Sequence, residues 1–222
     1  MKQRNAMIAV LGLLLVSPLS AGAKIRVACV GDSITYGHPV VYKHPEKTYP
    51  AVLGKLLGEK YDVRNFGCNS ATLVKIGNKP YVKQPAFKKA TEFNPHIVII
   101  KLGTNDTKVD AWMEKKQFVG DLKELVSHFR GLRAKPVVFL GIPVPVSPKR
   151  TRGITAPEVR DRIIPMIRRV AKEEKVPLID FHTPLANRLE LLPDTIHPNA
   201  KGYAIMAAAA HAELIARGRK GK

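Results

Sequence analysis

Five short apolar runs, rich in β-branched residues, constrain the fold of this chain more than any other feature. They occupy residues 25–30, 61–66, 96–102, 136–141 and 176–181. Their near-continuous hydrophobicity is typical of strands that are covered on both faces, as in a parallel sheet. The sequence therefore predicts a five-stranded parallel sheet.

Amphipathic helical patterns separate these runs. One apolar stripe extends from Phe118 to Phe129 and a second from Val159 to Val170, where Thr155 and Glu158 have the spacing of a capping box. Alternating strands and helices with right-handed crossovers place helices on both faces of one sheet. We predict an α/β fold, a three-layer α/β/α sandwich in a single domain over residues 24–222, ending in a helix over 198–216.

The first 23 residues have the pattern of a secretory signal peptide, with a basic start, a short apolar run and a small-residue end. The apolar run is shorter than the roughly 20 residues that span a bilayer, and no later segment reaches that length. We expect a signal peptide over 1–23 and an exported chain, periplasmic or secreted, without a transmembrane segment.

The chain carries 37 Lys and Arg against 18 Asp and Glu, a formal net charge of +19. Such a charge attracts anionic polymers or surfaces. The basic residues are nevertheless spread along the chain without a basic and aromatic reader motif, which argues against a nucleic-acid partner. The only cysteines, Cys29 and Cys68, lack the spacing of a zinc or redox motif, and we expect no disulfide.

Small and polar residues follow the first three runs directly. They are Gly31-Asp32-Ser33, Gly67-Cys68-Asn69 and Gly103-Thr104-Asn105-Asp106. In an open α/β sheet, functional groups gather where loops leave the carboxyl ends of the strands. We therefore expect these three segments to share one edge of the sheet.

Ser33 is the candidate nucleophile. A serine hydroxyl needs a base to take its proton, and His197 in Asp194-Thr195-Ile196-His197 is the candidate base. The carboxylate of Asp194 can turn back to the imidazole, fix its tautomer and stabilise the imidazolium. Acyl transfer also needs donors for the oxyanion, and the N–H groups of Ser33 and Gly67 with the side-chain amide of Asn105 are the candidates.

Other residues receive weaker assignments. Asp32 is expected to organise the turn that holds Ser33, and Asp106 to orient the Asn105 amide or cap the following turn. Three aromatic residues follow strand ends and could stack on a sugar ring: Tyr36, Tyr81 and Trp112. The histidines outside the motifs are assigned to surface or packing roles: His38, His44, His96, His128, His182 and His211. No metal-ligand spacing occurs, so metal catalysis is not expected.

In these motifs the chain resembles the SGNH, or GDSL-type, hydrolases. The family's four blocks are matched in order by Gly31-Asp32-Ser33, Gly67, Gly103-Thr104-Asn105-Asp106 and Asp194-Thr195-Ile196-His197. The resemblance implies a flavodoxin-like α/β/α fold and an acyl-enzyme mechanism without metal or cofactor. It also implies Ser33, Asp194 and His197 as the triad and Gly67 and Asn105 as oxyanion-hole residues. A closer similarity to bacterial exported carbohydrate O-acetylesterases extends over residues 31–37, 65–67, 100–106 and 194–199.

The function indicated is a serine esterase that hydrolyses short acyl groups, acetyl above all, on a small or polymeric carbohydrate. One alternative is a lysophospholipase or thioesterase acting on longer acyl chains, which would need an apolar groove. The loops over 69–84 and 104–114 are instead polar and basic. The other alternative is a non-catalytic module that binds carbohydrate or polyanions on a hydrolase fold.

Overall fold

The computed structural model describes residues 23–108, 112–146, 148 and 152–220. The predicted signal peptide falls almost entirely on residues 1–22, outside the described residues, so it stays a prediction.

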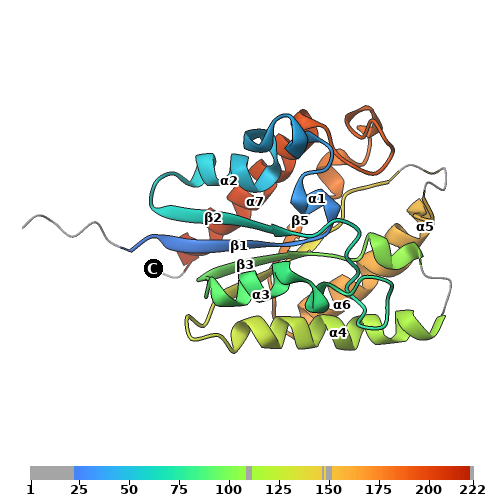
Figure 1. Ribbon diagram of the computed structural model, residues 1–222, viewed down its shortest axis with the longest axis horizontal. Coiled ribbons are helices and arrows are strands. Elements are labelled where there is room, and N and C mark those ends of the chain that lie inside the picture. The colour runs from blue at the N-terminus through green and yellow to red at the C-terminus, as the bar shows by residue number, and fades with distance from the viewer. Residues whose placement is uncertain (1–22, 109–111, 147, 149–151, 221–222) are drawn as a thin grey trace, which may run out of the picture.

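Five parallel strands form one sheet at the centre of the molecule (Figure 1). They are β1 (Ile25–Gly31), β2 (Tyr61–Gly67), β3 (Ile97–Lys101), β4 (Val137–Ile142) and β5 (Leu178–Asp180). The order is β2-β1-β3-β4-β5, and every neighbouring pair is parallel. The predicted parallel sheet is confirmed, and the chain order reverses at β1, which lies between β2 and β3.

The two edge strands differ from the prediction that all five runs are covered on both faces. In β2, Arg64 and Asn65 are exposed and only Phe66 is buried. An edge strand has one neighbour, so its polar side chains can reach water, and Arg64 pairs there with Asp62. The other edge, β5, is only three residues long.

Helices cover both faces of the sheet (Figure 1). On one face lie α2 (Tyr49–Leu57) and α7 (Ala200–Lys220), and on the other lie α3 (Pro85–Glu92), α4 (Trp112–Arg130) and α6 (Ile164–Glu173). Two shorter helices are α1 (Ser33–Tyr36) and α5 (Ala156–Glu158). Single-turn 3₁₀ segments lie at Val40–Tyr42, Pro45–Lys47, Tyr81–Lys83, Asn105–Lys108, Thr183–Leu185 and Leu189–Leu191, and a π-helical turn spans Val159–Ile163.

Each helix layer packs on the sheet through its own apolar core. The predicted stripe of α4 is buried at Phe118, Leu122 and Phe129, and these side chains pack with Ile167 and Val170 of α6. On the other face, α2 and α7 bury a second cluster against the sheet. Thr155 caps the start of α5 as predicted, accepting the N–H of Glu158 at 3.4 Å. The three-layer prediction is therefore confirmed.

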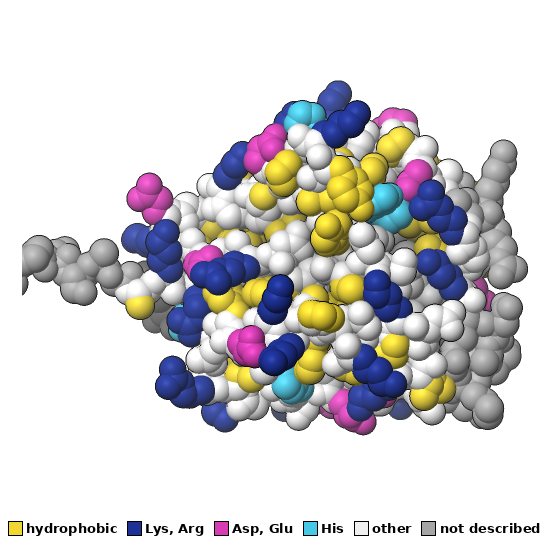
Figure 2. Space-filling view, viewed as in Figure 1, with side chains coloured by type: hydrophobic (Ala, Val, Ile, Leu, Met, Phe, Trp, Pro, Cys, Tyr) yellow, Lys and Arg dark blue, Asp and Glu magenta, His cyan; other side chains and the backbone are white. Residues whose placement is uncertain are grey.

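On the face seen in Figure 2, the described basic side chains do not gather in one dominant cluster. Figure 2 shows Lys and Arg side chains distributed over the visible face and interspersed with acidic ones. None of the helices in the described part of the chain is long and apolar enough to cross a bilayer. Cys29 is buried in β1, Cys68 is partly buried, and both are free thiols.

Candidate active site

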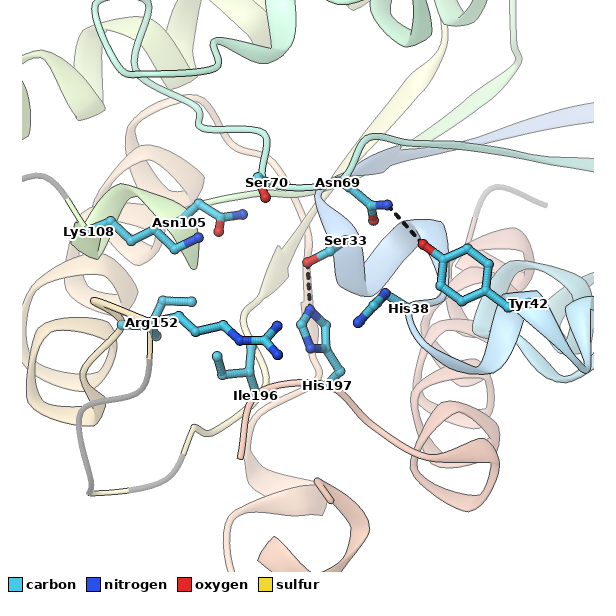
Figure 3. Close-up of a pocket in the computed structure, with 11 residues that line it drawn as sticks. Ser33, His38, Tyr42, Asn69, Ser70, Asn105, Lys108, Arg152, Ile196 and His197 are labelled. Atoms are coloured by element: carbon cyan, nitrogen blue, oxygen red, sulfur yellow. Dashed lines mark hydrogen bonds between the residues drawn. The ribbon is translucent and has the colours of Figure 1, made fainter. Parts of the chain in front are cut away.

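A pocket of about 230 Å³ lies beyond the carboxyl ends of the strands (Figure 3). Eleven of the described residues line it: Ser33, His38, Tyr42, Asn69, Ser70, Asn105, Lys108, Arg152, Ile154, Ile196 and His197. They come from the segments that follow all five strands, as expected for the edge of a parallel sheet where ligands bind. The structure thus brings Ser33, Asn105 and His197 together from distant parts of the sequence.

Ser33 is presented by the turn between β1 and α1. Asp32 is the N-cap of α1, and its carboxylate accepts the N–H of Ile34 at 2.9 Å. Ser33 is the first residue of the helix, so its own N–H has no acceptor within the helix. The hydroxyl and N–H of Ser33 are therefore held at the end of a buried strand.

A buried ion pair between Lys101 and Asp32 holds this turn in place. Lys101, the last residue of β3, is fully buried and donates to both carboxylate oxygens of Asp32, at 2.9 and 3.0 Å, and to Thr104 Oγ1 at 2.9 Å. Burial lowers the pKa of Lys101, and the Asp32 carboxylate opposes this. All three ammonium hydrogens have acceptors, which a buried charge requires. Sequence reasoning assigned Asp32 to the turn but missed Lys101.

Ser33, His197 and Asp194 form a continuous chain of hydrogen bonds. Ser33 Oγ lies 2.8 Å from His197 Nε2, and His197 Nδ1 lies 2.6 Å from Asp194 Oδ2. Burial lowers the pKa of His197, and its contact with Asp194 offsets this only in part. The imidazole is therefore neutral at neutral pH and can accept the Ser33 proton.

The loop that carries Asp194 and His197 is held by the Asp194 carboxylate itself. Asp194 Oδ1 accepts the N–H of His197 at 2.7 Å and that of Ile196 at 3.1 Å. Burial alone would raise the pKa of Asp194, but these donors and the imidazole bring it below its ordinary value. Thr195 lies between them at φ +70°, a left-handed conformation that is uncommon for a β-branched residue. One short loop thus provides both side chains in a fixed relation.

Asn105 lines the pocket and is almost fully buried. Its Nδ2 donates one hydrogen to the carbonyl of Ala71 at 3.1 Å, which leaves the second amide hydrogen available. Asp106 has a different partner from the two predicted: it accepts the N–H groups of Leu73 and Val74. Burial raises the pKa of Asp106 to about 6. Asp106 therefore fixes the loop after β2 rather than the Asn105 amide.

The prediction that Gly67 donates to an oxyanion is wrong. Gly67 does not line the pocket, and its N–H donates to Asn65 Oδ1 at 2.9 Å. Position 67 requires glycine for a different reason. A Cβ there would lie 2.1 Å from the backbone nitrogen of Tyr36, so only glycine allows the end of β2 to pack against α1. Ser70, three residues later, lines the pocket with φ +61°. No acceptor for the Ser70 N–H occurs among the described residues.

Of the three aromatic residues proposed for sugar stacking, none can be assigned to the pocket. Tyr81 is fully buried and donates to the carbonyl of Phe66 at 2.7 Å, which makes it a core residue. Tyr36 does not line the pocket, although its ring lies 6.4 Å from that of Tyr42. The side chain of Trp112 lies outside the described ones. Tyr42, which sequence reasoning missed, lines the pocket and is 62% exposed.

His38 was assigned to packing, yet it also lines the pocket, with its ring 4.6 Å from that of His197. Its position five residues after Ser33 was the only signal. His38, Asp194 and His197 are also the one group of side chains, in the described part of the chain, with the geometry to hold a metal ion. Asp194 Oδ2 and His197 Nδ1 already bond to each other.

Residues 29–205 match the model of the GDSL-like lipase/acylhydrolase family. The chain belongs to this family. The match confirms the predicted family and agrees with the prediction of an esterase. Its span covers Ser33, Asn105, Asp194 and His197.

A curated relative of this GDSL-like chain is an acetylxylan esterase of Xylanibacter ruminicola, 35% identical over 201 residues. The alignment covers 82% of this chain but only 42% of the relative, so the chain spans about two fifths of that protein's length.

Solved structures share the fold. A carbohydrate acetylesterase family member from Sinorhizobium meliloti superposes with a TM-score of 0.67 at 20% identity, covering 89% of this chain and 99% of that one. The aryl esterase of M. smegmatis gives a TM-score of 0.66 at 22% identity, covering 87% and 99%. These similarities confirm the predicted SGNH hydrolase fold.

Proposed function

We propose that the protein is an exported serine esterase that removes short acyl groups, acetyl in particular, from carbohydrates through an acyl-enzyme intermediate. The observation that carries the proposal is the hydrogen-bonded chain from Ser33 through His197 to Asp194 at the wall of a pocket whose described lining residues are mostly polar. A neutral imidazole between a hydroxyl and a carboxylate is the arrangement that activates serine for attack on a carbonyl.

The proposed reaction has two halves. His197 Nε2 takes the Ser33 proton as Ser33 Oγ bonds to the ester carbon, and Asp194 stabilises the imidazolium. The tetrahedral intermediate collapses, the bond to the sugar oxygen breaks, and His197 returns the proton to that oxygen. Water then attacks the acyl group on Ser33 with His197 again as base, releasing the carboxylic acid and free Ser33.

Three donors are proposed for the oxyanion: the N–H groups of Ser33 and Ser70 and the second hydrogen of Asn105 Nδ2. Each belongs to a residue that lines the pocket, and none has an acceptor among the described residues. Donors left without a partner beside a nucleophile can stabilise charge that develops only during the reaction. Ser70 replaces Gly67 in this assignment.

Several features of the pocket support a small acyl group on a sugar. Among the described residues that line it, only Ile154 and Ile196 are aliphatic, and these two form no groove for a long chain. Asn69 Oδ1 is a buried acceptor without a partner, suited to a sugar hydroxyl, and the exposed Tyr42 ring can stack on a sugar face. The relative from Xylanibacter ruminicola is named for acetylxylan, which points to the same class of substrate.

Acetate release from acetylated glycans by the full chain and by Ser33→Ala tests this function. Ser33→Ala should lower the rate by about five to six orders of magnitude, because a serine nucleophile cannot be replaced by its neighbours. Ser127→Ala, an exposed position in α4, is the matched control and should retain full activity. A Ser33→Ala protein with a native circular dichroism spectrum and substantial activity would refute the assignment.

Acyl chain length separates this function from its main alternative. The full chain should hydrolyse nitrophenyl acetate faster than nitrophenyl octanoate, since only two aliphatic side chains, Ile154 and Ile196, occur among the described residues that line the pocket. Faster turnover of the octanoate would instead favour a lysophospholipase or thioesterase.

A further inference from the structure

Two cationic side chains line the pocket that holds Ser33. Lys108 comes from the segment after β3 and Arg152 from the segment after β4. Figure 3 shows both side chains reaching into the pocket on the side opposite His38 and Tyr42, with the Ser33–His197 pair between the two sides. We refer to Lys108 and Arg152 together as the basic wall.

The basic wall has no acidic partner among the described residues. Neither cation takes part in an ion pair or a hydrogen bond there. The nearby carboxylates are engaged elsewhere, Asp32 with Lys101 and Asp194 with His197. Two like charges facing one pocket repel each other, and an anion bound between them would offset that repulsion.

The electrostatics of Lys108 agree with this geometry. Burial lowers the pKa of Lys108, the Asp32 carboxylate opposes this, and the charge of Arg152 adds to the lowering. A bound anion would reverse both effects, because it would replace lost water and lie between the cations. The pocket therefore favours an anionic ligand on this side.

We propose that the basic wall binds the carboxylate of an acidic sugar, so that the preferred substrate is an O-acetylated acidic glycan rather than a neutral one. This inference rests on the proposed function, because it places the ester at Ser33 and the carboxylate on the same sugar or its neighbour. Arginine suits this role because its planar guanidinium can bind a carboxylate through two parallel hydrogen bonds.

Paired substrates test the inference. Acetate release is compared between O-acetylated galacturonate oligomers and O-acetylated galactose oligomers of the same length, as the ratio of their kcat/KM values. The wild-type ratio should favour the acidic oligomer, and Lys108→Met or Arg152→Gln should each lower it about tenfold, the weight of one charge-assisted hydrogen bond. High salt should also reduce the wild-type ratio.

Lys60→Met and Arg133→Gln are matched controls. Both residues are exposed and come shortly before β2 and β4. They therefore lie near the amino ends of the strands, at the end of the sheet opposite the pocket. They should leave the ratio unchanged. An equal fall in all four variants would mean that net charge, not the basic wall, attracts the substrate, and would overturn the inference.

Binding to the inactive protein separates this inference from the proposed function. Calorimetry on Ser33→Ala should show tighter binding of galacturonate oligomers than of galactose oligomers, and adding Arg152→Gln should remove the difference. Equal binding would overturn the basic wall while acetate release by the wild type still supported the esterase. A preference for sulfated over carboxylated oligomers would also overturn it, since the site would then serve a different anion.

Discussion

The two sides of the pocket differ in whether their polar groups have partners within the chain. On the side of Ser33, His197 and Asp194, each side chain is hydrogen-bonded to the next, and Lys101 satisfies Asp32 beneath them. On the basic wall, Lys108 and Arg152 have no such partner among the described residues. Groups satisfied internally are held in one geometry, as chemistry requires, whereas unsatisfied charges are available to a ligand. We infer that one side of the pocket serves the reaction and the other serves recognition.

Disrupting the hydrogen bonds that join Ser33, His197 and Asp194 should have the largest effect on activity. Asp194→Asn should lower kcat by about four orders of magnitude with little loss of structure, because an amide no longer favours the imidazole tautomer that accepts the Ser33 proton. Kinetics on an acetyl ester with circular dichroism measure this. Asp161→Asn, in an exposed ion pair with Arg160, is the matched control and should leave kcat unchanged. A loss under tenfold for Asp194→Asn would remove Asp194 from the triad.

Removing the buried ion pair between Lys101 and Asp32 should reduce the stability of the fold. Lys101→Met leaves the fully buried Asp32 carboxylate unpaired, and we expect about 3–5 kcal/mol less free energy of unfolding. Urea denaturation measures the change. Lys88→Met, which removes an exposed pair with Glu92, should cost no more than about 0.5 kcal/mol. Similar losses for the two variants would show that the buried pair is not a structural anchor.

The value of kcat/KM should fall in acid, because His197 becomes protonated. The catalytic form is neutral, and burial lowers the pKa of His197 below its ordinary 6.5. The value of kcat/KM should therefore be level above pH 6.5 and fall about tenfold per pH unit once the pH is below that pKa. Asp194→Asn should move the fall to lower pH, since the carboxylate raises this pKa. His44→Gln, at an exposed position, should not move it, and a midpoint above 6.5 would contradict the assignment.

The smallest effect on activity is expected for a substitution at Ser70. It distinguishes the role of the Ser70 backbone N–H from that of the Ser70 hydroxyl. Ser70→Gly keeps the N–H and relieves the left-handed φ of +61°, while glycine costs more backbone entropy. Activity should stay within a few-fold of wild type, and the free energy of unfolding should change by less than about 1 kcal/mol. A hundredfold loss of kcat would mean that the Ser70 hydroxyl, not its N–H, acts in the site.

The parts of the fold that could be predicted from sequence depend on repeating patterns. The apolar runs identified all five strands, and the parallel sheet then placed Ser33 near His197 although they are 164 residues apart. The short spacing of Asp194 and His197 allowed their contact to be predicted locally. These inferences succeeded because strand ends in a parallel sheet share one edge.

The errors lie in the loops, where no repeating pattern fixes which side a group faces. At the end of β2 the Gly67 N–H donates to Asn65, and the turn that follows brings Ser70 to the pocket instead. The same loop returns to the core, which buries Tyr81 against Phe66. Lys108 ends the 3₁₀ turn after β3 and Arg152 lies after β4 without a repeating sequence pattern, so their convergence on the pocket could not be predicted from their separation in sequence.

Covalent labelling tests the central claim most directly. The protein is treated with a fluorophosphonate probe, digested, and examined by peptide mass spectrometry, with Ser33→Ala and Ser127→Ala treated in parallel. We expect one stoichiometric adduct on Ser33, present in Ser127→Ala and absent from Ser33→Ala, because Ser33 is the one serine in the described part of the chain whose hydroxyl lies 2.8 Å from a base that is itself bonded to a carboxylate. A folded wild-type protein that releases acetate while Ser33 stays unlabelled, or that is labelled at another serine, would contradict it.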